Sequence, residues 1–231
     1  MTRFKIVNDG TWGSAEGPRQ FKVMTENQAG FEAYAEAAGQ AATYAATCMA
    51  NTITYLNSGR PGEMARAFMR ILFLSRTATM KSDFSTVNSV LVCTLNGMNT
   101  SSFALKIRPH KNSYGYVVKP VARKSPVPKD WHNSVTNMRD GSTRIAGAIH
   151  LSAKLLNDAD DRGRAAHTVI HEATHKYAGT EDYCYFSQQE NGDPKPKTDF
   201  TLRERALRNA DSFAWIAFAI GDTIATGGEL F

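Results

Sequence analysis

Two histidines and the glutamate between them are the residues of this sequence best suited to chemistry. Residues 171–175 read His-Glu-Ala-Thr-His. On a helix, His171 and His175 would project from one face, because residues four apart differ by roughly 40° around the axis. Two neutral imidazoles so placed can share a Zn²⁺ ion, and Glu172 could activate a water molecule as a general base. The same pattern also occurs by chance in helices whose histidines and glutamate are only solvated.

A catalytic zinc ion needs a third protein ligand, and two acidic residues compete for that role. Asp182 lies seven residues after His175 and follows Gly179, which can take the left-handed conformation that ends a helix and reverses the chain. Glu204 is the rival, but Thr201–Glu204 has the pattern of a capping box, which already accounts for this glutamate. We therefore favour Asp182.

Three other residues near the motif have weaker or different roles. Glu190 lies in a polar stretch and is a poorer ligand candidate than Asp182. His167 could reach the edge of the site, but as a fourth ligand it would close the position that a catalytic water needs. Tyr185 could donate a hydrogen bond to an oxyanion that develops on the substrate.

Asp211 is expected on a largely apolar helix face. Leu207 and Trp215 lie four residues to either side of it, and a buried carboxylate requires partners. One interpretation is a salt bridge, for example to Arg208. The other is an acid at the floor of the site or in the pocket that follows the cleaved bond.

Together these residues resemble the aspzincin metallopeptidases, the family of deuterolysin and the peptidyl-lysine metalloendopeptidases. The pattern HExxH then G-T-x-D-x-x-Y occurs at residues 171–175 and 179–185, and the Asn-Ala-Asp of a C-terminal helix occurs at 209–211. The clear resemblance covers residues 145–218. It implies a zincin-like metalloendopeptidase with protein or peptide substrates, in which zinc is bound by His171, His175 and Asp182, Glu172 is the base, Tyr185 stabilises the transition state and Asp211 binds substrate.

The resemblance does not extend to every position. In lysine-specific members an acidic residue lies three positions after the helix aspartate, where this chain has Ala214. The family's tyrosine is usually followed by glycine, where this chain has Phe186. The motif therefore implies peptidase chemistry and leaves the cleavage preference open.

The composition, with 42% hydrophobic and 21% charged residues, is that of an ordinary globular protein. No stretch approaches the roughly 18 uninterrupted apolar residues of a membrane span. No apolar run follows Met1–Lys5, so we expect no Sec-type leader and either a cytoplasmic location or a leaderless export route. Such a route would suit a toxin or effector protease with a narrow protein target. A non-catalytic zinc-binding module is the third hypothesis, and retention of Glu172 and Tyr185 argues against it.

The net charge of +5 is mild for 231 residues, and the basic residues cluster only locally. The cluster includes two tyrosines, so a nucleic-acid surface is one interpretation and a rim that attracts acidic substrates is another. We favour a solvated strand and loop and expect no nucleic-acid partner. The basic residues are Arg108, Lys111, Lys119, Arg123 and Lys124.

The three cysteines are far apart in the sequence and show neither a paired disulfide framework nor a zinc knuckle. We expect Cys48, Cys93 and Cys184 to be reduced thiols packed as small apolar groups. One disulfide with a free thiol is the alternative.

Helices are expected at both ends of the chain. Residues 30–56 are rich in alanine, Pro61 suits the first turn of a helix that continues to about Leu74, and residues 162–178 carry the His-Glu-Ala-Thr-His motif. Residues 1–27 mix glycine, proline and short β-type runs and are predicted to form an N-terminal arm or hairpin. Residues 28–231 would then be the metallopeptidase domain.

Strands are expected in the middle of the chain. Residues 103–107 and 114–118 alternate well enough to be paired strands, and 145–151 is a strand that could form the edge for an extended peptide. Residues 84–98 suit either a strand or a helix, and 119–143 are predicted to be a long loop. This order predicts an α+β fold with a helical N-terminal part and a small antiparallel sheet.

Overall fold

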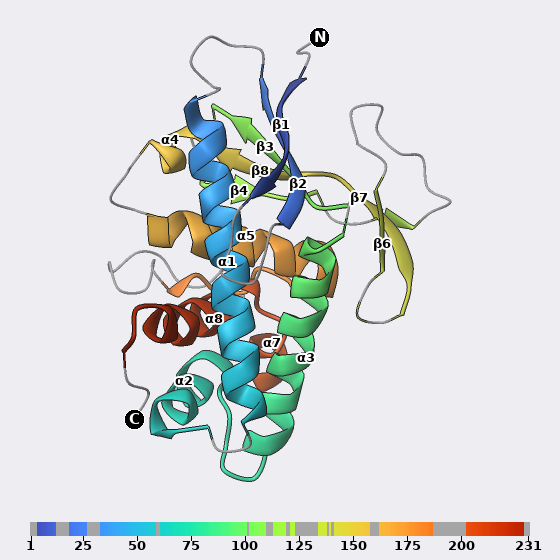
Figure 1. Ribbon diagram of the computed structural model, residues 1–231. Helices are drawn as coiled ribbons and strands as arrows, with labels where there is room; N and C mark the ends of the chain where they lie inside the picture. The colour runs from blue at the N-terminus through green and yellow to red at the C-terminus, as the bar shows by residue number, and fades with distance from the viewer. Residues whose placement is uncertain are drawn as a thin grey trace.

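The computed structural model describes most of the chain, and every structural statement below concerns these residues. They are 4–12, 19–26, 33–58, 61–100, 102–109, 113–118, 121–122, 134–137, 139, 141–157, 162–186 and 202–228. The protein is α+β, mostly helical, with a small mixed sheet. The main sheet lies at one end of the long helix α1 (Ala33–Asn57), and most of the other helices lie beside the rest of that helix (Figure 1).

The main sheet has five strands in the order β1-β2-β3-β8-β4. The β1–β2 and β4–β8 pairs are antiparallel, whereas β2–β3 and β3–β8 are parallel. The prediction of a small antiparallel sheet is therefore wrong for this main sheet, which is mixed. Three helices lie between β2 and β3 in sequence, and so long a crossover lets the chain re-enter the sheet in the same direction. The strands are β1 (Phe4–Trp12), β2 (Arg19–Glu26), β3 (Ala104–Arg108), β8 (Ile149–Ser152) and β4 (Gly115–Tyr116).

Strand β4, not β8, is the edge of the main sheet next to the helix that carries the motif. The run 145–151 is divided between β7 (Thr143–Ala146) and β8, and β8 is covered by β3 on one side and β4 on the other. The expected edge at 145–151 is wrong for this reason. Strands β3 and β4 are both present as predicted, but β8 separates them, so they do not pair with each other.

A second, three-stranded sheet has the order β5-β7-β6 and is antiparallel throughout. It extends to one side of the main body (Figure 1). Two of its strands, β5 (Val121–Ala122) and β6 (Ser134–Asn137), lie within the stretch 119–143. The prediction of a long loop there is wrong at these strands, which are too short for alternation to be recognised.

The predicted helices are present with nearly the expected bounds. The ambiguous stretch 84–98 is helical and lies within α3. Helix α5 begins and ends where the sequence predicts. The principal helices are α1 (Ala33–Asn57), α2 (Glu63–Phe73), α3 (Met80–Met98), α5 (Arg162–Ala178) and α8 (Ala210–Ala225), with the short α4 (Ala153–Leu156) and α7 (Arg203–Ala206).

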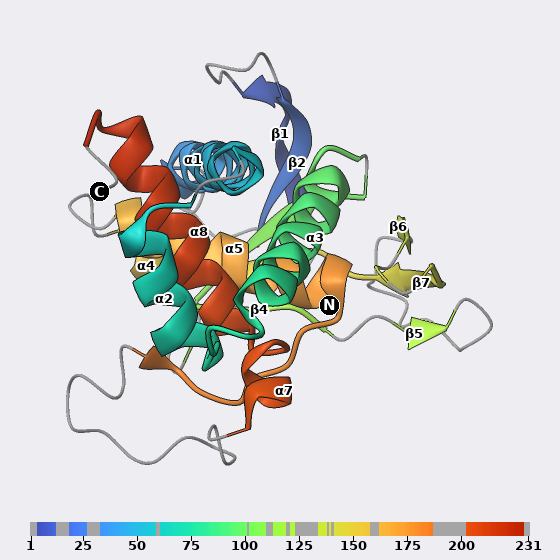
Figure 2. The same cartoon turned by 90° about the horizontal axis from the view of Figure 1, so that it is seen from below.

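Helices α8, α5 and α3 all pack against the long helix α1 (Figure 2). Its buried face consists largely of alanines, whose small side chains let the neighbouring helices approach closely. The Thr52 hydroxyl donates to the carbonyl of Ala217 at 3.0 Å and so joins α1 to α8. Large side chains fill the rest of the core, among them Phe73, Tyr177 and Phe213, each 0% exposed.

Two further expectations can be compared with the structure. No described helix is long and apolar enough to cross a membrane. Cys48, Cys93 and Cys184 are not joined by a disulfide, as predicted, and Cys48 and Cys184 are buried. Of the basic cluster only Arg108 is described, at the end of β3; its other members lie outside the described residues.

Candidate metal centre

Helix α5 alone brings the two histidines of the motif together. Its apolar stripe is buried against the core, since Ala166, Ile170 and Ala173 are each 0% exposed. His171 and His175 therefore share the face next to that stripe. Their rings meet edge to face with centroids 4.8 Å apart, and the two Nε2 atoms are 3.1 Å apart.

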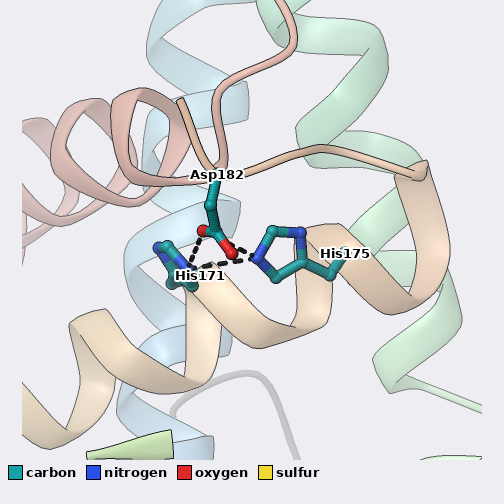
Figure 3. A group of neighbouring side chains, drawn as sticks. All are labelled: His171, His175 and Asp182. Atoms are coloured by element: carbon teal, nitrogen blue, oxygen red, sulfur yellow. Dashed lines mark hydrogen bonds and ion pairs between the residues drawn. The ribbon is translucent and has the colours of Figure 1, made fainter. Parts of the chain in front are cut away.

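The loop that follows α5 returns the chain to the same two nitrogens. We call residues 179–186 the ligand loop. Gly179 has φ of +69°, the left-handed conformation that its residue type predicts, and it ends the helix. Asp182 Oδ1 then lies 3.0 Å from His171 Nε2 and 3.2 Å from His175 Nε2. Figure 3 shows the carboxylate positioned between the two rings.

These three side chains fit a metal ion. Their ligand atoms all lie within 4.8 Å of one another, and His171, His175 and Asp182 are the one such group among the described residues. Tetrahedral zinc with ligands at about 2.0–2.2 Å has neighbouring ligand atoms roughly 3.3–3.5 Å apart. The separations of 3.0–3.2 Å in this triangle are close to that spacing. The geometry suits a metal ion without indicating which one.

The outer nitrogens of the histidines have partners that determine the tautomer. His175 Nδ1 lies 2.8 Å from the carbonyl oxygen of Thr180, which can only accept, so we place a proton on this Nδ1. His171 Nδ1 lies 3.6 Å from Asp211 Oδ1. Both Nε2 lone pairs then face each other and the Asp182 carboxylate. This arrangement is repulsive unless a cation, either a proton or a metal ion, lies among the three atoms.

The charges of the metal-free site follow from these contacts. Burial opposes the charged form of His171, but the hydrogen bond with Asp182 and the nearby carboxylate of Asp211 outweigh it and raise the pKa of His171 to about 10. Burial would raise the pKa of Asp182, yet the hydrogen bond from His171 and the positive charge of that ring hold it well below its usual range. In the metal-free chain the imidazole and carboxylate therefore form an ion pair, and a metal ion would replace the shared proton.

Glu172 lies beside the edge strand β4. Its side chain is buried, and burial raises the pKa of its carboxyl. The backbone N–H of Val117, just after β4, donates to it. A Cβ atom on Gly115 would lie 2.7 Å from Thr168 Cγ2 and 3.3 Å from Glu172 Cγ. Glycine at position 115 is thus required for β4 to approach α5 this closely. This close approach places Glu172 beside the outermost strand of the sheet.

Tyr185 is at the other end of the ligand loop. Its ring stacks on that of His171 with centroids 5.6 Å apart and an interplanar angle of 19°. Burial is the main cause that raises the pKa of its phenol, and the charge of Asp182 and a hydrogen bond with it add to the effect. The phenol therefore stays protonated at neutral pH and can act as a hydrogen-bond donor at the site.

Asp211 is 3% exposed and lies against the far side of His171. Its Oδ1 atom is 3.6 Å from both His171 Nδ1 and His167 Nε2, and its Oδ2 accepts from the backbone N–H of Phe186 at 2.7 Å. The interpretation of a salt bridge to Arg208 is not what these contacts show, since Arg208 lies 3.7 Å from Glu181 instead. Asp211 thus lies next to the Nδ1 side of His171, and its substrate-binding role stays a prediction.

The remaining candidates lie away from the metal centre or outside the described residues. Glu204 is exposed on α7 and is not part of the ligand cluster. His167 packs against Trp215 with ring centroids 4.8 Å apart and an interplanar angle of 57°, and burial lowers its pKa to about 4, so it is a neutral ring. Glu190 and Thr201 lie outside the described residues.

Three contributors to the site are not evident from the motif alone. The carbonyl of Thr180 and the backbone of Val117 act through main-chain atoms, which carry no residue-type signal. Asn209 bonds to the ligand loop through its side chain. Its position in the Asn-Ala-Asp sequence could have marked it, but only the aspartate of that motif has an obvious chemical role.

No protein-family model matches the chain, and no curated protein matches its sequence. The argument for function therefore rests on the residues of the site.

Proposed function

We propose that the protein is a zinc-dependent metalloendopeptidase of the aspzincin type, with a zincin-like domain. The observation that carries this proposal is the meeting of His171, His175 and Asp182 beside the buried carboxyl of Glu172. Two imidazoles and one carboxylate are a donor set that suits catalytic zinc, and three protein ligands leave a fourth position open. When bound, the metal would supply positive charge that acidifies a water molecule and polarises a carbonyl group.

The protein's own residues would handle the proton and the substrate. Glu172, next in sequence to His171, would accept the proton of the attacking water and deliver it to the leaving amine. The raised pKa of its carboxyl makes Glu172 a stronger base toward the proton of a water molecule. Tyr185, stacked on His171, would donate its phenolic hydrogen bond to the carbonyl oxygen as negative charge develops there.

The substrate would bind as an extended peptide along β4. This strand is the edge of the main sheet, and among the described strands none pairs with its outer side. An added strand forms main-chain hydrogen bonds with such an edge. A peptide bound there would pass Glu172, because the segment that contains β4 contacts this carboxylate through Val117.

The proposal is tested by the variant Glu172→Gln, assayed for zinc content and for hydrolysis of a denatured protein. We expect the variant to retain zinc and to lose proteolysis, because the amide cannot accept the proton. Glu204→Gln is the matched control, since it makes the same change at an exposed residue outside the cluster. Hydrolysis by Glu172→Gln at the wild-type rate would contradict the proposal.

A further inference from the structure

Asn209 precedes α8 at the N-cap position but does not cap that helix. Its backbone is extended, with φ of −80° and ψ of 118°, as is usual for an N-cap residue, yet it makes no side-chain cap hydrogen bond. Asparagine at this position normally accepts from the second or third backbone N–H of its own helix. The side chain of Asn209, which is 0% exposed, is instead directed at another segment.

That segment is the ligand loop. Asn209 Oδ1 accepts from the backbone N–H of Tyr183 at 2.9 Å and from that of Cys184 at 3.0 Å. Its Nδ2 donates to the carbonyl of Cys184 at 3.2 Å and to Ser212 Oγ at 3.0 Å. All four hydrogen-bonding positions of the amide are thus occupied, and three of these bonds hold the two residues that follow Asp182.

The backbone on the other side of Asp182 is held by the same part of the chain. The N–H of Glu181 donates to the carbonyl of Arg208 at 2.8 Å, and the N–H of Ala210 donates to the carbonyl of Glu181 at 2.9 Å. Asp182 is therefore the one residue between two anchored positions. Its carboxylate is directed at the histidines because the chain on either side of it is fixed to the start of α8.

We propose that Asn209 is a positioning residue, which fixes Asp182 and Tyr185 of the ligand loop relative to the histidines of α5. The inference rests on the proposed metal centre for its consequence, but the hydrogen bonds exist without a metal ion. Loss of the amide would leave the N–H groups of Tyr183 and Cys184 without their acceptor at a site where Cys184 is 1% exposed. Burying such unpaired groups is unfavourable, so the loop would move to reach water.

Two substitutions separate positioning from helix capping. Serine is as good an N-cap residue as asparagine, but its side chain is too short to replace the contacts with both N–H groups. Aspartate keeps the acceptor oxygen for both N–H groups, but it replaces the Nδ2 donor by an anionic oxygen that faces the carbonyl of Cys184. If Asn209 served only α8, Asn209→Ser would resemble wild type. For a positioning residue, Asn209→Ser has the full defect and Asn209→Asp recovers part of the function.

Thr52→Val is the matched control for a general loss of stability. It removes a buried side-chain hydrogen bond to α8 at Ala217, which is eight residues, or roughly 12 Å, along the helix from Asn209. Any destabilisation of α8 as a whole would appear in this variant too. A defect confined to the ligand loop would not.

The experiment measures amide hydrogen exchange at Tyr183 and Cys184 in the metal-free 231-residue chain, then zinc affinity and the visible spectrum of the Co²⁺-loaded protein. In Asn209→Ser we expect exchange at these amides to be at least about 10-fold faster than in Thr52→Val, since each loses a buried hydrogen bond. We expect zinc affinity to fall about 10- to 100-fold, the usual loss when an outer partner of a metal site is removed, with altered Co²⁺ bands. Asn209→Asp should lie between wild type and Asn209→Ser in each measurement.

The outcomes distinguish this inference from the proposed function. Exchange in Asn209→Ser equal to that in Thr52→Val, or an Asn209→Asp variant no better than Asn209→Ser, would overturn the positioning role. Faster exchange together with a wild-type chain that binds no zinc would support Asn209 as the residue that fixes the loop and would overturn the metal centre. Faster exchange with unchanged zinc affinity and unchanged Co²⁺ bands would overturn the claim that a fixed ligand loop positions Asp182 for the metal ion.

Discussion

The two halves of the metal centre are positioned in different ways. His171 and His175 are one helical turn apart on α5, so the geometry of a single helix determines their separation. Asp182 and Tyr185 lie on a loop whose conformation depends on hydrogen bonds to residues 208–211, more than twenty positions later in the chain. The comparison shows that local sequence is sufficient for the first half, whereas the second half requires the folded domain.

Removal of the loop ligand should have the largest effect. In Asp182→Ala the histidine pair on α5 remains, but two ligands hold zinc far less well than three. We expect zinc affinity to fall by more than about 100-fold, beyond the range seen when an outer partner is lost. A competition titration with a zinc chelator would measure this loss, and wild-type affinity in the variant would exclude Asp182 as a ligand.

Asp211→Asn tests whether the helical half also depends on α8. The Oδ1 atom of Asp211 lies 3.6 Å from His171 Nδ1, and its charge favours the tautomer whose Nε2 lone pair faces the metal. The amide lacks that charge, so we expect about 10- to 100-fold weaker zinc binding. Calorimetric titration with zinc gives the affinity, and Asp222→Asn, at the opposite end of α8, is the matched control. Equal affinities in wild type and Asp211→Asn would show that α5 orients His171 unaided.

A salt bridge next to this region should affect stability without affecting the metal. Asp83 of α3 is buried and pairs with Arg203 of α7, the short helix that leads to residues 208–211. Hydrogen bonds to charged groups contribute about 1.5–3 kcal/mol, and this pair is partly exposed, so we expect Asp83→Asn to lower the free energy of unfolding by about 1–2 kcal/mol at pH 7. Urea unfolding measures it.

The pH dependence of this effect has a defined sign. Burial opposes the charge of Asp83, but hydrogen bonds from Arg203 and Thr79 and the charge of Arg203 outweigh it and lower the pKa of its carboxyl. The stabilisation is therefore complete above the pKa of an unfolded aspartate, about 3.9, and is lost as the pH falls through the lower pKa of the folded chain. The difference between wild type and Asp83→Asn should shrink under those acidic conditions. A difference that grew instead would contradict the assignment.

The smallest expected change is at Thr180. Its carbonyl, at 2.8 Å from His175 Nδ1, orients the ring, while its hydroxyl is 3.2 Å from the same nitrogen. Thr180→Val removes only the hydroxyl, so we expect zinc affinity to change by less than about 10-fold, below the usual loss for an outer partner. A larger loss would mean that the hydroxyl, which also contacts the hydroxyl of Thr174, is the group that orients His175.

In the fold, as in the metal centre, features set by local sequence could be predicted, whereas features set by long-range contacts could not. The bounds of α5, the reversal at Gly179 and the reduced cysteines follow from periodicity, glycine and cysteine spacing, and the structure confirms them. The division of residues 145–151 between two sheets could not be predicted, because strand order depends on which distant segments meet. The parallel pairings of β3 have the same origin.

The same limit applies to the metal centre, where the sequence indicates the ligands but not all of the groups that orient them. Spacing alone places His171 and His175 on one face, and the aspartate after Gly179 is an evident third candidate. The partners of these residues are main-chain atoms of Thr180 and Val117 and the side chain of Asn209. A carbonyl or an N–H has no residue type, so its role becomes visible only when the chain is folded.

Anomalous diffraction at the zinc edge from crystals of the zinc-loaded protein tests the central claim most directly. The account predicts one zinc peak, bounded by His171 Nε2, His175 Nε2 and an Asp182 carboxylate oxygen at about 2.0–2.2 Å. No cysteine sulfur should lie within bonding distance of it. A protein that takes up no zinc at this position, or a peak held by other residues, would contradict the account.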